Sequence, residues 1–445
     1  MSRLIFPAPS WSTLLAALES TDGLESAAIL LVAPSAGDPF RVLVHDVVVV
    51  PSAAYEVRTP FNLTISQSFL AAVTKRARLE HLGVVLVHTH PGTEWPTFSP
   101  VDQSSAPALA DFFIGRSPTG IHGFLVLGGH GFEGRVRTTD GVWSAIEAID
   151  EVGPEIVTVR AGGDDTRQFD AIAFDRNVRA FGEEGQARLS AIRVAIVGLG
   201  GIGSIVLQQL AHLGVMRFLL LDHDKLEASN LNRVVGARIP DVGRLKVDVA
   251  RDCVSRIRPD AQVTTAGDIR RAQEGRRVLG VDFMFGCTDS HGSRAVVNQL
   301  AYQHLLPTID MGVRIDAANG SVARIVGRVQ MLAPSLACLV CEHLLDPDAV
   351  RRDLLSDEER AKDPYIIGSA EPAPAVISIN GVVASLAVTM FLGSFLGLPV
   401  ATRHQMYLGD EGVVRRVRAQ PHPECVVCSS SGVLARGDTL PMPWR

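Results

Sequence analysis

The segment IRVAIVGLGGIGSIVLQQLAHL, residues 192–213, decides the fold of the larger part of the chain. Its apolar start predicts a buried strand, a glycine-rich turn follows, and Ile205–Leu213 has the pattern of a helix. A second apolar strand at Arg217–Leu221 completes a βαβ unit. Two later apolar strands, at 281–285 and 307–309, extend the predicted parallel sheet. Residues 321–332 predict an antiparallel hairpin appended to it. We therefore expect a Rossmann-like, doubly wound α/β domain.

The turn between this strand and helix carries four glycines, and a carboxylate follows the next strand. Glycine lets the backbone approach phosphate groups, and the N-terminus of a helix favours negative charge. Asp222 stands at the end of the second strand, where a carboxylate can bind the hydroxyls of a ribose. This much fits NAD as well as ATP. The glycines are Gly198, Gly200, Gly201 and Gly203.

Charged residues further along favour ATP. Arg233 follows Asn230 in the run SNLNR, Lys246 stands after a short loop, and Asp289 follows a later strand. In nucleotidyl transfer, arginine and lysine neutralise a triphosphate and an aspartate holds magnesium. A hydride-transfer enzyme needs no such set, so the sequence favours ATP and Mg²⁺ over NAD.

These residues resemble the adenylating enzymes MoeB and ThiF and the adenylation domain of ubiquitin-activating enzymes, over residues 174–428. The segment FDRNVR, residues 174–179, is similar to the YDRQIR segment of that family. There, Arg176 would reach the phosphates, usually those of the partner subunit, so the resemblance also implies a homodimer. Val234 departs from the common glutamine and removes one polar phosphate contact. The resemblance further implies these roles: Asp222 on ribose, Asn230, Arg233 and Lys246 on phosphates, and Asp289 on magnesium.

Two histidines stand at the end of another predicted strand, near the start of the chain. The apolar run 82–87 leads into His88, and His90 projects to the same side because strand side chains alternate. Asp102 follows after a proline-rich loop. Two imidazoles and one carboxylate leave a fourth zinc position open for water, which is typical of a catalytic zinc.

This segment resembles the JAMM signature, HxHP followed by SxxD, which implies a cytidine-deaminase-like α/β fold and a zinc-dependent isopeptidase. The match implies that Asp102 is the third ligand and that Ser99 supports the oxyanion. Glu25 is the candidate general acid/base, in a segment similar to the glutamate-containing segment of the family, and Glu19 is the alternative. A degenerate domain that only binds its partner is the main rival interpretation.

Four of the six cysteines form two CxxC pairs. Four thiolates make a closed tetrahedral zinc site, so we expect a structural role that ties the later segment back onto the domain; a redox role is the alternative. The remaining thiols are Cys253 and Cys287, and the segment 342–375, in which ubiquitin-activating enzymes place an acyl-accepting cysteine, has none. The pairs are Cys338 with Cys341 and Cys425 with Cys428.

Composition and turn signals complete the expected organisation. Hydrophobic residues make up 47% of the chain and the net charge is −6 without a basic block, so nucleic acid is a poor candidate for a partner. The apolar run 381–398 predicts a core helix rather than a membrane span. Residues 141–149 predict a helix that closes the first domain. We expect a cytoplasmic protein with a JAMM domain at 1–150, a linker at 151–172 and an adenylating domain at 173–445.

Together the two resemblances imply ATP-dependent adenylation of the C-terminal glycine of a ubiquitin-like β-grasp protein, and zinc-dependent hydrolysis of amides after that glycine. The alternative is activation and processing of a sulfur carrier for cofactor or cysteine synthesis. A conjugating enzyme would be the further partner in the first case, and a sulfurtransferase in the second.

Overall fold

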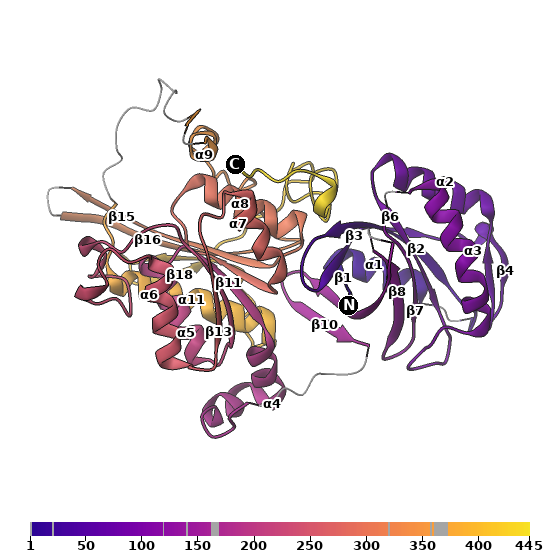
Figure 1. Ribbon diagram of the computed structural model, residues 1–445, viewed down its shortest axis with the longest axis horizontal. Helices are drawn as coiled ribbons and strands as arrows, with labels where there is room; N and C mark the ends of the chain where they lie inside the picture. The colour runs from indigo at the N-terminus through magenta and orange to yellow at the C-terminus, as the bar shows by residue number, and fades with distance from the viewer. Residues whose placement is uncertain are drawn as a thin grey trace. The chain divides into compact units, whose positions relative to one another are not determined.

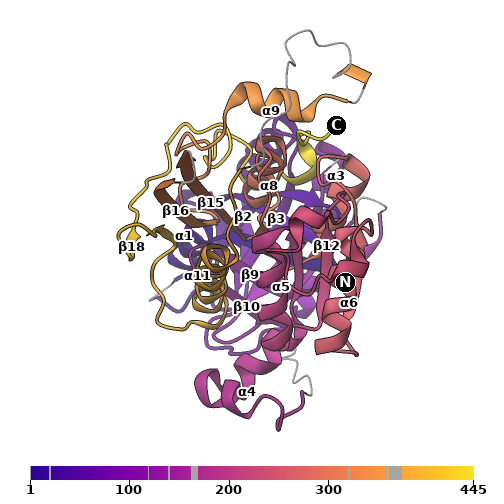
Figure 2. The same cartoon turned by 90° about the vertical axis from the view of Figure 1, so that its left-hand side faces the viewer.

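The computed structural model describes the chain apart from residues 1, 20–21, 119, 139–140, 162–168, 319–320, 357 and 360–372. The described residues form two compact units. The first unit contains residues 1–164, 303–305 and 429–441, and the second contains 165–302, 306–428 and 442–445. Figures 1 and 2 show their helices and strands from two directions.

The first unit is built on one eight-stranded sheet. Its strand order is β1-β3-β2-β6-β7-β8-β9-β10, and β1 pairs in parallel with both β3 and β9, so the sheet closes on itself. A small two-stranded sheet of β4 and β5 stands apart. The strands are β1 (Ser2–Pro7), β2 (Ala27–Ser35), β3 (Phe40–Val49), β4 (Tyr55–Arg58), β5 (Leu63–Ile65), β6 (Gly83–Thr89), β7 (His122–Leu127), β8 (Phe132–Arg137), β9 (Trp143–Val152) and β10 (Ile156–Arg160).

Both faces of this sheet are covered, which explains the continuous apolar run of β2. Ile29 and Leu31 pack with helices α2 (Gln67–Leu79) and α3 (Pro100–Arg116) on one face. Leu30, which points the other way, packs with α1 (Ala8–Leu18). Strands buried on two faces read as uninterrupted hydrophobic segments because neither set of side chains meets water.

The predicted helix at 141–149 is wrong. Residues 143–152 form strand β9, which pairs with β1, β8 and β10. The spacing of Ile146 and Ile149 and the surrounding alanine and glutamate suit a helix in isolation, but pairing with the distant β1 and with the neighbouring β8 and β10 outweighs that local preference. Strand β10 also lies inside the predicted linker 151–172, as the second strand of a hairpin with β9.

The second unit contains an eight-stranded sheet of order β13-β12-β11-β14-β15-β16-β17-β18. The first five strands are parallel, and the others continue antiparallel. Residues 321–332 form one strand of a hairpin with β15 rather than a hairpin of their own. The strands are β11 (Arg193–Val197), β12 (Arg217–Leu221), β13 (Gln262–Ala266), β14 (Phe283–Gly286), β15 (Thr308–Ala318), β16 (Ser321–Leu332), β17 (His404–Leu408) and β18 (Val413–Arg416).

Helices cover both faces of this sheet. Helices α5 and α8 lie on opposite sides, because the connections from β11 and β14 run in opposite directions along the sheet (Figure 1). The carboxyl ends of β11 and β14 therefore flank a topological switch point, where open α/β sheets bind ligands. The helices are α4 (Asp175–Ala191), α5 (Gly201–His212), α6 (Lys246–Ile257), α7 (Ala272–Gly275), α8 (His291–Gln303), α9 (Pro347–Leu354) and α11 (Ile377–Leu396).

Helix α11 contains most of the predicted apolar run. By length and composition it is a candidate membrane span, and half of the relevant window is buried. It packs on α5, β15 and β16, as expected for a core helix, and its polar Asn380 is buried beside the glycine-rich turn.

Candidate functional sites

The glycine-rich turn of the second unit is shaped by close backbone contacts. Gly198 follows β11 with a φ of +89°, a conformation that favours glycine, and it lies against the Cys287 carbonyl. A Cβ atom on Gly203 would stand 1.9 Å from the Gly198 oxygen, and one on Gly201 would stand 2.2 Å from Nδ2 of Asn380. In contrast, a Cβ atom on Gly200 would meet nothing within 4 Å. The open side at Gly200 is where a phosphate can approach the start of α5.

Asp222 lies beside this turn, as predicted. Its carboxylate accepts hydrogen bonds from the backbone N–H groups of Leu199 (2.7 Å) and Asp224 (2.9 Å). Burial raises the pKa of Asp222, while the positive charge of Lys246 opposes that rise. The carboxylate is thus held against the turn, in reach of a ribose bound there.

Lys246 has a partner that the sequence did not reveal. Its Nζ lies 2.7 Å from Oδ2 of Asp224, and its backbone N–H donates to the Asp224 carbonyl. Burial acts to raise the pKa of Asp224, but the hydrogen bond and charge of Lys246 lower it overall. Asp224 stands two residues after Asp222, and that spacing beside a strand end was the available signal.

Asn230 and Arg233 lie in the loop between β12 and α6. The buried Asn230 accepts a hydrogen bond from the Glu227 N–H through its side chain, so it shapes this loop. Arg233 donates to the Ser229 carbonyl (2.6 Å), and its Cδ lies close to Gly201. Val234, where the family pattern has a polar residue, is buried with Leu226 and Val249. The structure therefore brings Arg233 and Lys246 to the edge of the same turn.

Asp289 and Arg176 have fewer contacts with the glycine-rich turn than the other predicted site residues of this unit. Asp289 is exposed in the segment after β14, whose Cys287 and Thr288 touch Gly198. Arg176 is exposed on α4, outside the contacts that join the other nucleotide residues in the described part of the chain. Its predicted role across a dimer interface stays a prediction.

The three predicted metal ligands of the first unit converge. Nε2 of His88 lies 3.2 Å from Oδ1 of Asp102 and 3.2 Å from Nε2 of His90, and Nε2 of His90 lies 3.3 Å from Oδ2 of Asp102. Zinc bonds of about 2.0–2.1 Å place tetrahedral ligands about 3.4 Å apart. The geometry therefore fits a zinc ion that keeps a free position.

Secondary structure aims these ligands at one point. His88 belongs to β6 and His90 follows its end, while Asp102 lies in the first turn of α3. Ser99 caps this helix: its Oγ accepts from the Asp102 N–H (3.1 Å), and Asp102 accepts from the Ser99 N–H (2.7 Å). Ser99 thus positions a ligand, and its own hydroxyl hydrogen is left to donate. Burial acts to raise the pKa of Asp102, but hydrogen bonds from His88 and Ser99 lower it overall.

Glu25, not Glu19, is brought to the three ligands. Oε1 of Glu25 lies 3.9 Å from Nε2 of His90, and the residue is 5% exposed, whereas Glu19 is exposed at the end of α1. Arg58 holds this segment by donating to the Glu25 carbonyl (2.8 Å). Burial raises the pKa of Glu25, as suits a general base that must also release a proton.

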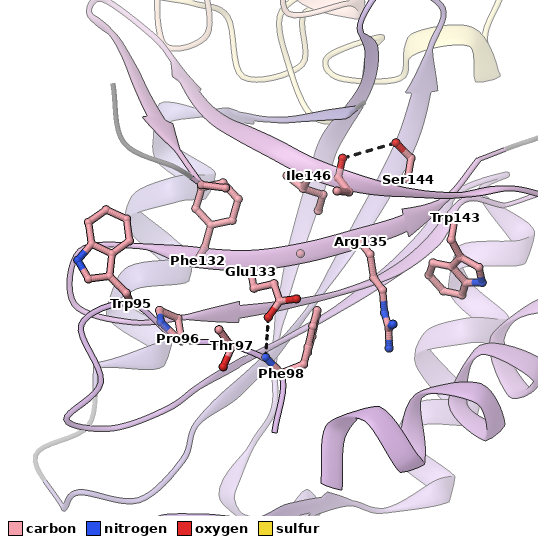
Figure 3. A pocket seen from close by; sticks show the side chains of 13 residues that line it. Trp95, Pro96, Thr97, Phe98, Phe132, Glu133, Arg135, Trp143, Ser144 and Ile146 are labelled. Atoms are coloured by element: carbon pink, nitrogen blue, oxygen red, sulfur yellow. Dashed lines mark hydrogen bonds between the residues drawn. The ribbon is translucent and has the colours of Figure 1, made fainter. Parts of the chain in front are cut away.

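An aromatic pocket of about 530 Å³ adjoins the loop between His90 and Ser99. Figure 3 shows Trp95 and Phe132 at one end and Arg135 and Trp143 at the other. The Arg135 guanidinium lies 5.0 Å from the ring centroid of Phe98 and 5.6 Å from that of Trp143. This pocket puts apolar surface beside the loop that leads to Asp102.

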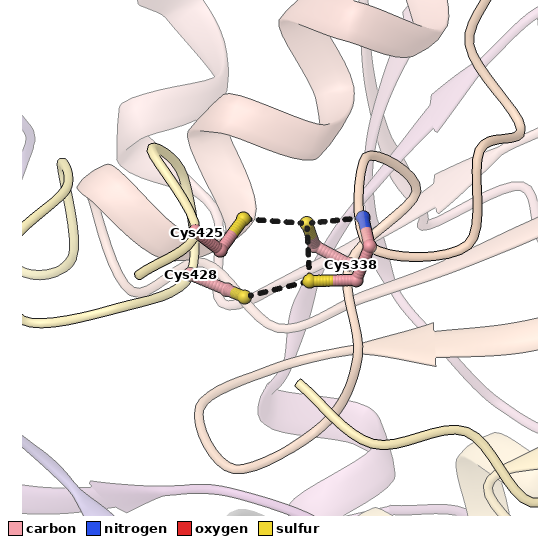
Figure 4. A group of neighbouring side chains, drawn as sticks. Cys338, Cys425 and Cys428 are labelled. Carbon is pink, nitrogen blue, oxygen red and sulfur yellow. Dashed lines mark hydrogen bonds between the residues drawn. The ribbon is translucent and has the colours of Figure 1, made fainter. Parts of the chain in front are cut away.

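The four predicted zinc thiols gather in the second unit (Figure 4). Sγ of Cys338 lies 3.7 Å from that of Cys341 and 3.6 Å from that of Cys425, and the sulfurs of Cys341 and Cys428 are 3.4 Å apart. Zinc–sulfur bonds of about 2.3 Å place tetrahedral thiolates about 3.8 Å apart. The donor set fits a closed structural zinc site. Ser429–Pro441, directly after it, packs with the first unit, where Asp438 accepts from the Ala36 N–H.

The two remaining thiols are poorly suited to nucleophilic attack. Cys253 is buried in α6, and burial raises the pKa of its thiol. Burial and the nearby Asp310 carboxylate raise the pKa of the Cys287 thiol strongly. The segment 342–375, expected to lack an acyl-accepting cysteine, falls partly outside the described residues.

Comparison with known proteins places residues 174–427 in a model described as the ThiF family. The "Ubiquitin-like modifier-activating enzyme 5" of Oryza sativa subsp. japonica is 29% identical over 54% of this chain and 56% of its own length. The enzyme of the same name from Arabidopsis thaliana is 28% identical, again over 54% of this chain, and 55% of its own length is matched. The chain therefore spans little more than half the length of these two relatives.

Two further similarities concern a shorter relative and solved structures. The "SAMP-activating enzyme E1" of Haloferax volcanii is 26% identical over 60% of this chain and 93% of its own length. The crystal structure of E. coli MccB is similar with a TM-score of 0.47 at 21% identity, covering 60% of this chain and 74% of that one. A structure of E. coli MccB with ATP has a TM-score of 0.45, also at 21% identity, over 58% and 74% of the two chains.

Proposed function

Because the chain belongs to the ThiF family, we propose that its second unit binds ATP and Mg²⁺ and adenylates the C-terminal glycine of a ubiquitin-like β-grasp protein. The observation that carries this proposal is the convergence of Asp222, Arg233 and Lys246 on one glycine-rich turn. Two similar proteins are named as activating enzymes, one for a ubiquitin-like modifier and one for SAMP. These names support a ubiquitin-like protein as the substrate.

In the proposed reaction, the carboxylate of the C-terminal glycine attacks the α-phosphate of ATP. A bond forms between the carboxylate oxygen and phosphorus, and pyrophosphate leaves with the electrons of the broken P–O bond. Arg233 and Lys246 stabilise the negative charge that develops on the phosphates, and Asp222 orients the ribose. Mg²⁺ held by Asp289 would neutralise further phosphate charge.

ATP–pyrophosphate exchange, driven by a candidate β-grasp protein, tests this step. Lys246→Ala should slow exchange by on the order of 100-fold or more, because one charge facing the transition state is lost. Arg251→Ala is the matched control: Arg251 is an exposed cation on the same helix, paired with Asp248. Equal exchange by Lys246→Ala and the control would refute the assignment of the site.

For the first unit, we propose JAMM-type hydrolysis of an amide bond after the same glycine. Zinc held by His88, His90 and Asp102 would activate a water molecule as a nucleophile. Glu25 would take the proton of that water and pass it to the leaving amine, and the Ser99 hydroxyl would donate to the oxyanion. The close approach of Glu25 to His90 is the observation that supports these roles.

Cleavage of a β-grasp protein that carries a short C-terminal extension tests this second activity. Glu25→Gln should abolish cleavage while zinc remains bound, because the ligands are intact. Glu19→Gln should cleave like the parent protein, since Glu19 is exposed at the end of α1. The opposite pattern would transfer the role of base to Glu19.

Activation of a sulfur carrier is the second candidate function. It is favoured by the raised pKa of the Cys287 thiol and by the lack of a cysteine in residues 342–375, which disfavour a thioester on this chain. A sulfurtransferase would then take the adenylate onward, whereas a conjugating enzyme would serve protein modification. Mass spectrometry of the partner after reaction separates a C-terminal thiocarboxylate from a lysine conjugate. We propose a homodimer and a cytoplasmic location for either function.

A further inference from the structure

Helix α9 packs on the segment that contains Asp289. Its Asp353 side chain accepts two hydrogen bonds through Oδ2, from the Ser290 hydroxyl (2.8 Å) and from the Gly292 N–H (2.9 Å). A Cβ atom on Gly292 would stand 2.5 Å from the Asp353 Cβ, so the contact needs glycine there. Asp353 therefore accepts from an N–H group in the first turn of α8, which would otherwise lack a partner within the helix. The two residues that it binds lie one and three positions after Asp289.

A second contact fixes the other end of α9. The Asp346 N–H, at the N-terminal cap of α9, donates to Nδ1 of His291 (3.1 Å). The cap itself is well formed, since the Asp346 side chain accepts from the N–H groups of Asp348 and Ala349. Both ends of α9 thus bind residues 290–292, where α8 begins.

Two arginines that pair with Asp268 hold the C-terminal end of α9 in place. Arg270 donates to the Asp353 carbonyl (3.1 Å) and pairs with the buried Asp268 (2.8 Å). Arg445 also binds Asp268 (2.8 Å) and donates to the Leu355 carbonyl (3.1 Å). Buried charges that are paired in this way resist rearrangement, because each lost partner leaves an uncompensated charge.

Helix α9 is held without a fully buried side chain. Helix α9 has eight residues, and none of them is buried. A helix of this length is marginal in water, and it has no buried apolar side chain to anchor it. Its position therefore depends on the bonds of Asp353, Asp346 and Arg270.

We propose that Asp353 is a positioning residue for the magnesium-binding segment, and that it sets the affinity of the ATP site for Mg²⁺ by fixing the backbone beside Asp289. This rests on the proposed adenylation function. With Asp353 in place, residues 290–292 are held, and the exposed Asp289 carboxylate starts from a fixed backbone. Without it, the Gly292 N–H loses its partner and Asp289 must be ordered when the ion binds, which weakens binding.

Calorimetric titration of the full chain with ATP, at stepped Mg²⁺ concentrations and without Mg²⁺, tests the proposal. Asp353→Ala should raise the Mg²⁺ concentration for half-maximal enhancement of ATP affinity roughly tenfold, since hydrogen bonds to a charged group are lost. ATP affinity without Mg²⁺ should stay unchanged. Asp353→Asn retains a side-chain acceptor and should recover most of the parent value. Asp348→Ala, an exposed acidic residue of the same helix without a role in the contact, should match the parent protein.

The outcomes separate this proposal from the proposed function. If Asp289→Ala removes the Mg²⁺ enhancement but Asp353→Ala leaves it intact, the positioning role is refuted. If Asp353→Ala lowers ATP affinity equally with and without Mg²⁺, or Asp353→Asn fails to recover, the residue is merely structural and the proposal is again refuted. If Asp289→Ala itself has no effect, the magnesium site of the proposed function is wrong. Thermal unfolding of each variant shows whether the fold is kept.

Discussion

The proposed nucleotide site of the second unit and the proposed metal site of the first unit are built in opposite ways. The nucleotide turn is shaped by backbone packing: Gly198 touches the Cys287 carbonyl, and Gly203 leaves no room for a Cβ atom. The metal site is made by side chains that converge from β6, the segment after it and the start of α3. A side chain added at the packed glycines, Gly198 or Gly203, should therefore damage the fold, whereas substitution of a ligand should remove the metal and leave the fold intact.

The largest effect is expected at the metal site. His88→Ala removes one of three ligands, so the protein should lose about one of two bound zinc ions and all cleavage activity, with its thermal stability nearly kept. Elemental analysis of the purified protein measures zinc, and circular dichroism measures unfolding. His130→Ala is the control, since His130 is exposed and pairs with Glu94. Unchanged zinc content in His88→Ala would exclude the site.

The nucleotide turn should respond to added volume. Gly203→Ala places a Cβ atom 1.9 Å from the Gly198 oxygen, a backbone atom that cannot move away without shifting β11 or α5. We expect a loss of about 1–3 kcal/mol in the free energy of unfolding, measured by urea denaturation. Gly200→Ala, where a Cβ atom meets nothing within 4 Å, should unfold like the parent. Equal stability of the two variants would contradict the packing argument.

A smaller effect is expected for Asp222, whose carboxylate lies beside the turn. In the proposed function Asp222 faces the ribose hydroxyls, so Asp222→Asn should lower the preference for ATP over 2′-deoxy-ATP roughly tenfold, as for a hydrogen bond to a charged group. Competitive binding of the two nucleotides measures the preference. A variant that still distinguishes them would place the ribose elsewhere.

The smallest effect is expected at the free thiols. Cys253→Ser and Cys287→Ser should each retain ATP–pyrophosphate exchange, because burial raises the pKa of both thiols and neither is needed for adenylation. A non-reducing gel should show no reductant-sensitive adduct with the partner. An adduct that Cys287→Ser abolishes would establish a thioester on this chain.

Local patterns in the sequence predicted the parts of both sites that depend on short spacing. His88 and His90 share a side because a strand alternates, and Ser99 and Asp102 stand at the fixed spacing of the JAMM signature. The glycines of the turn and Asp222 were likewise predicted from their positions, because they stand directly after two apolar strands. Such features need only neighbouring residues, so the amino-acid pattern is sufficient.

Other features were decided by tertiary structure. Residues 143–152 became strand β9 because the distant β1 pairs with them in addition to the neighbouring β8 and β10. The sequence named Glu25 as the candidate and Glu19 as the alternative, and the tertiary structure brought Glu25 to His90. Contacts such as Lys246 with Asp224 and Asp353 with Gly292 join residues that are 22 and 61 positions apart. The sequence pattern alone does not predict such pairs. The partner of each side chain depends on which distant segments the whole fold brings within hydrogen-bonding distance.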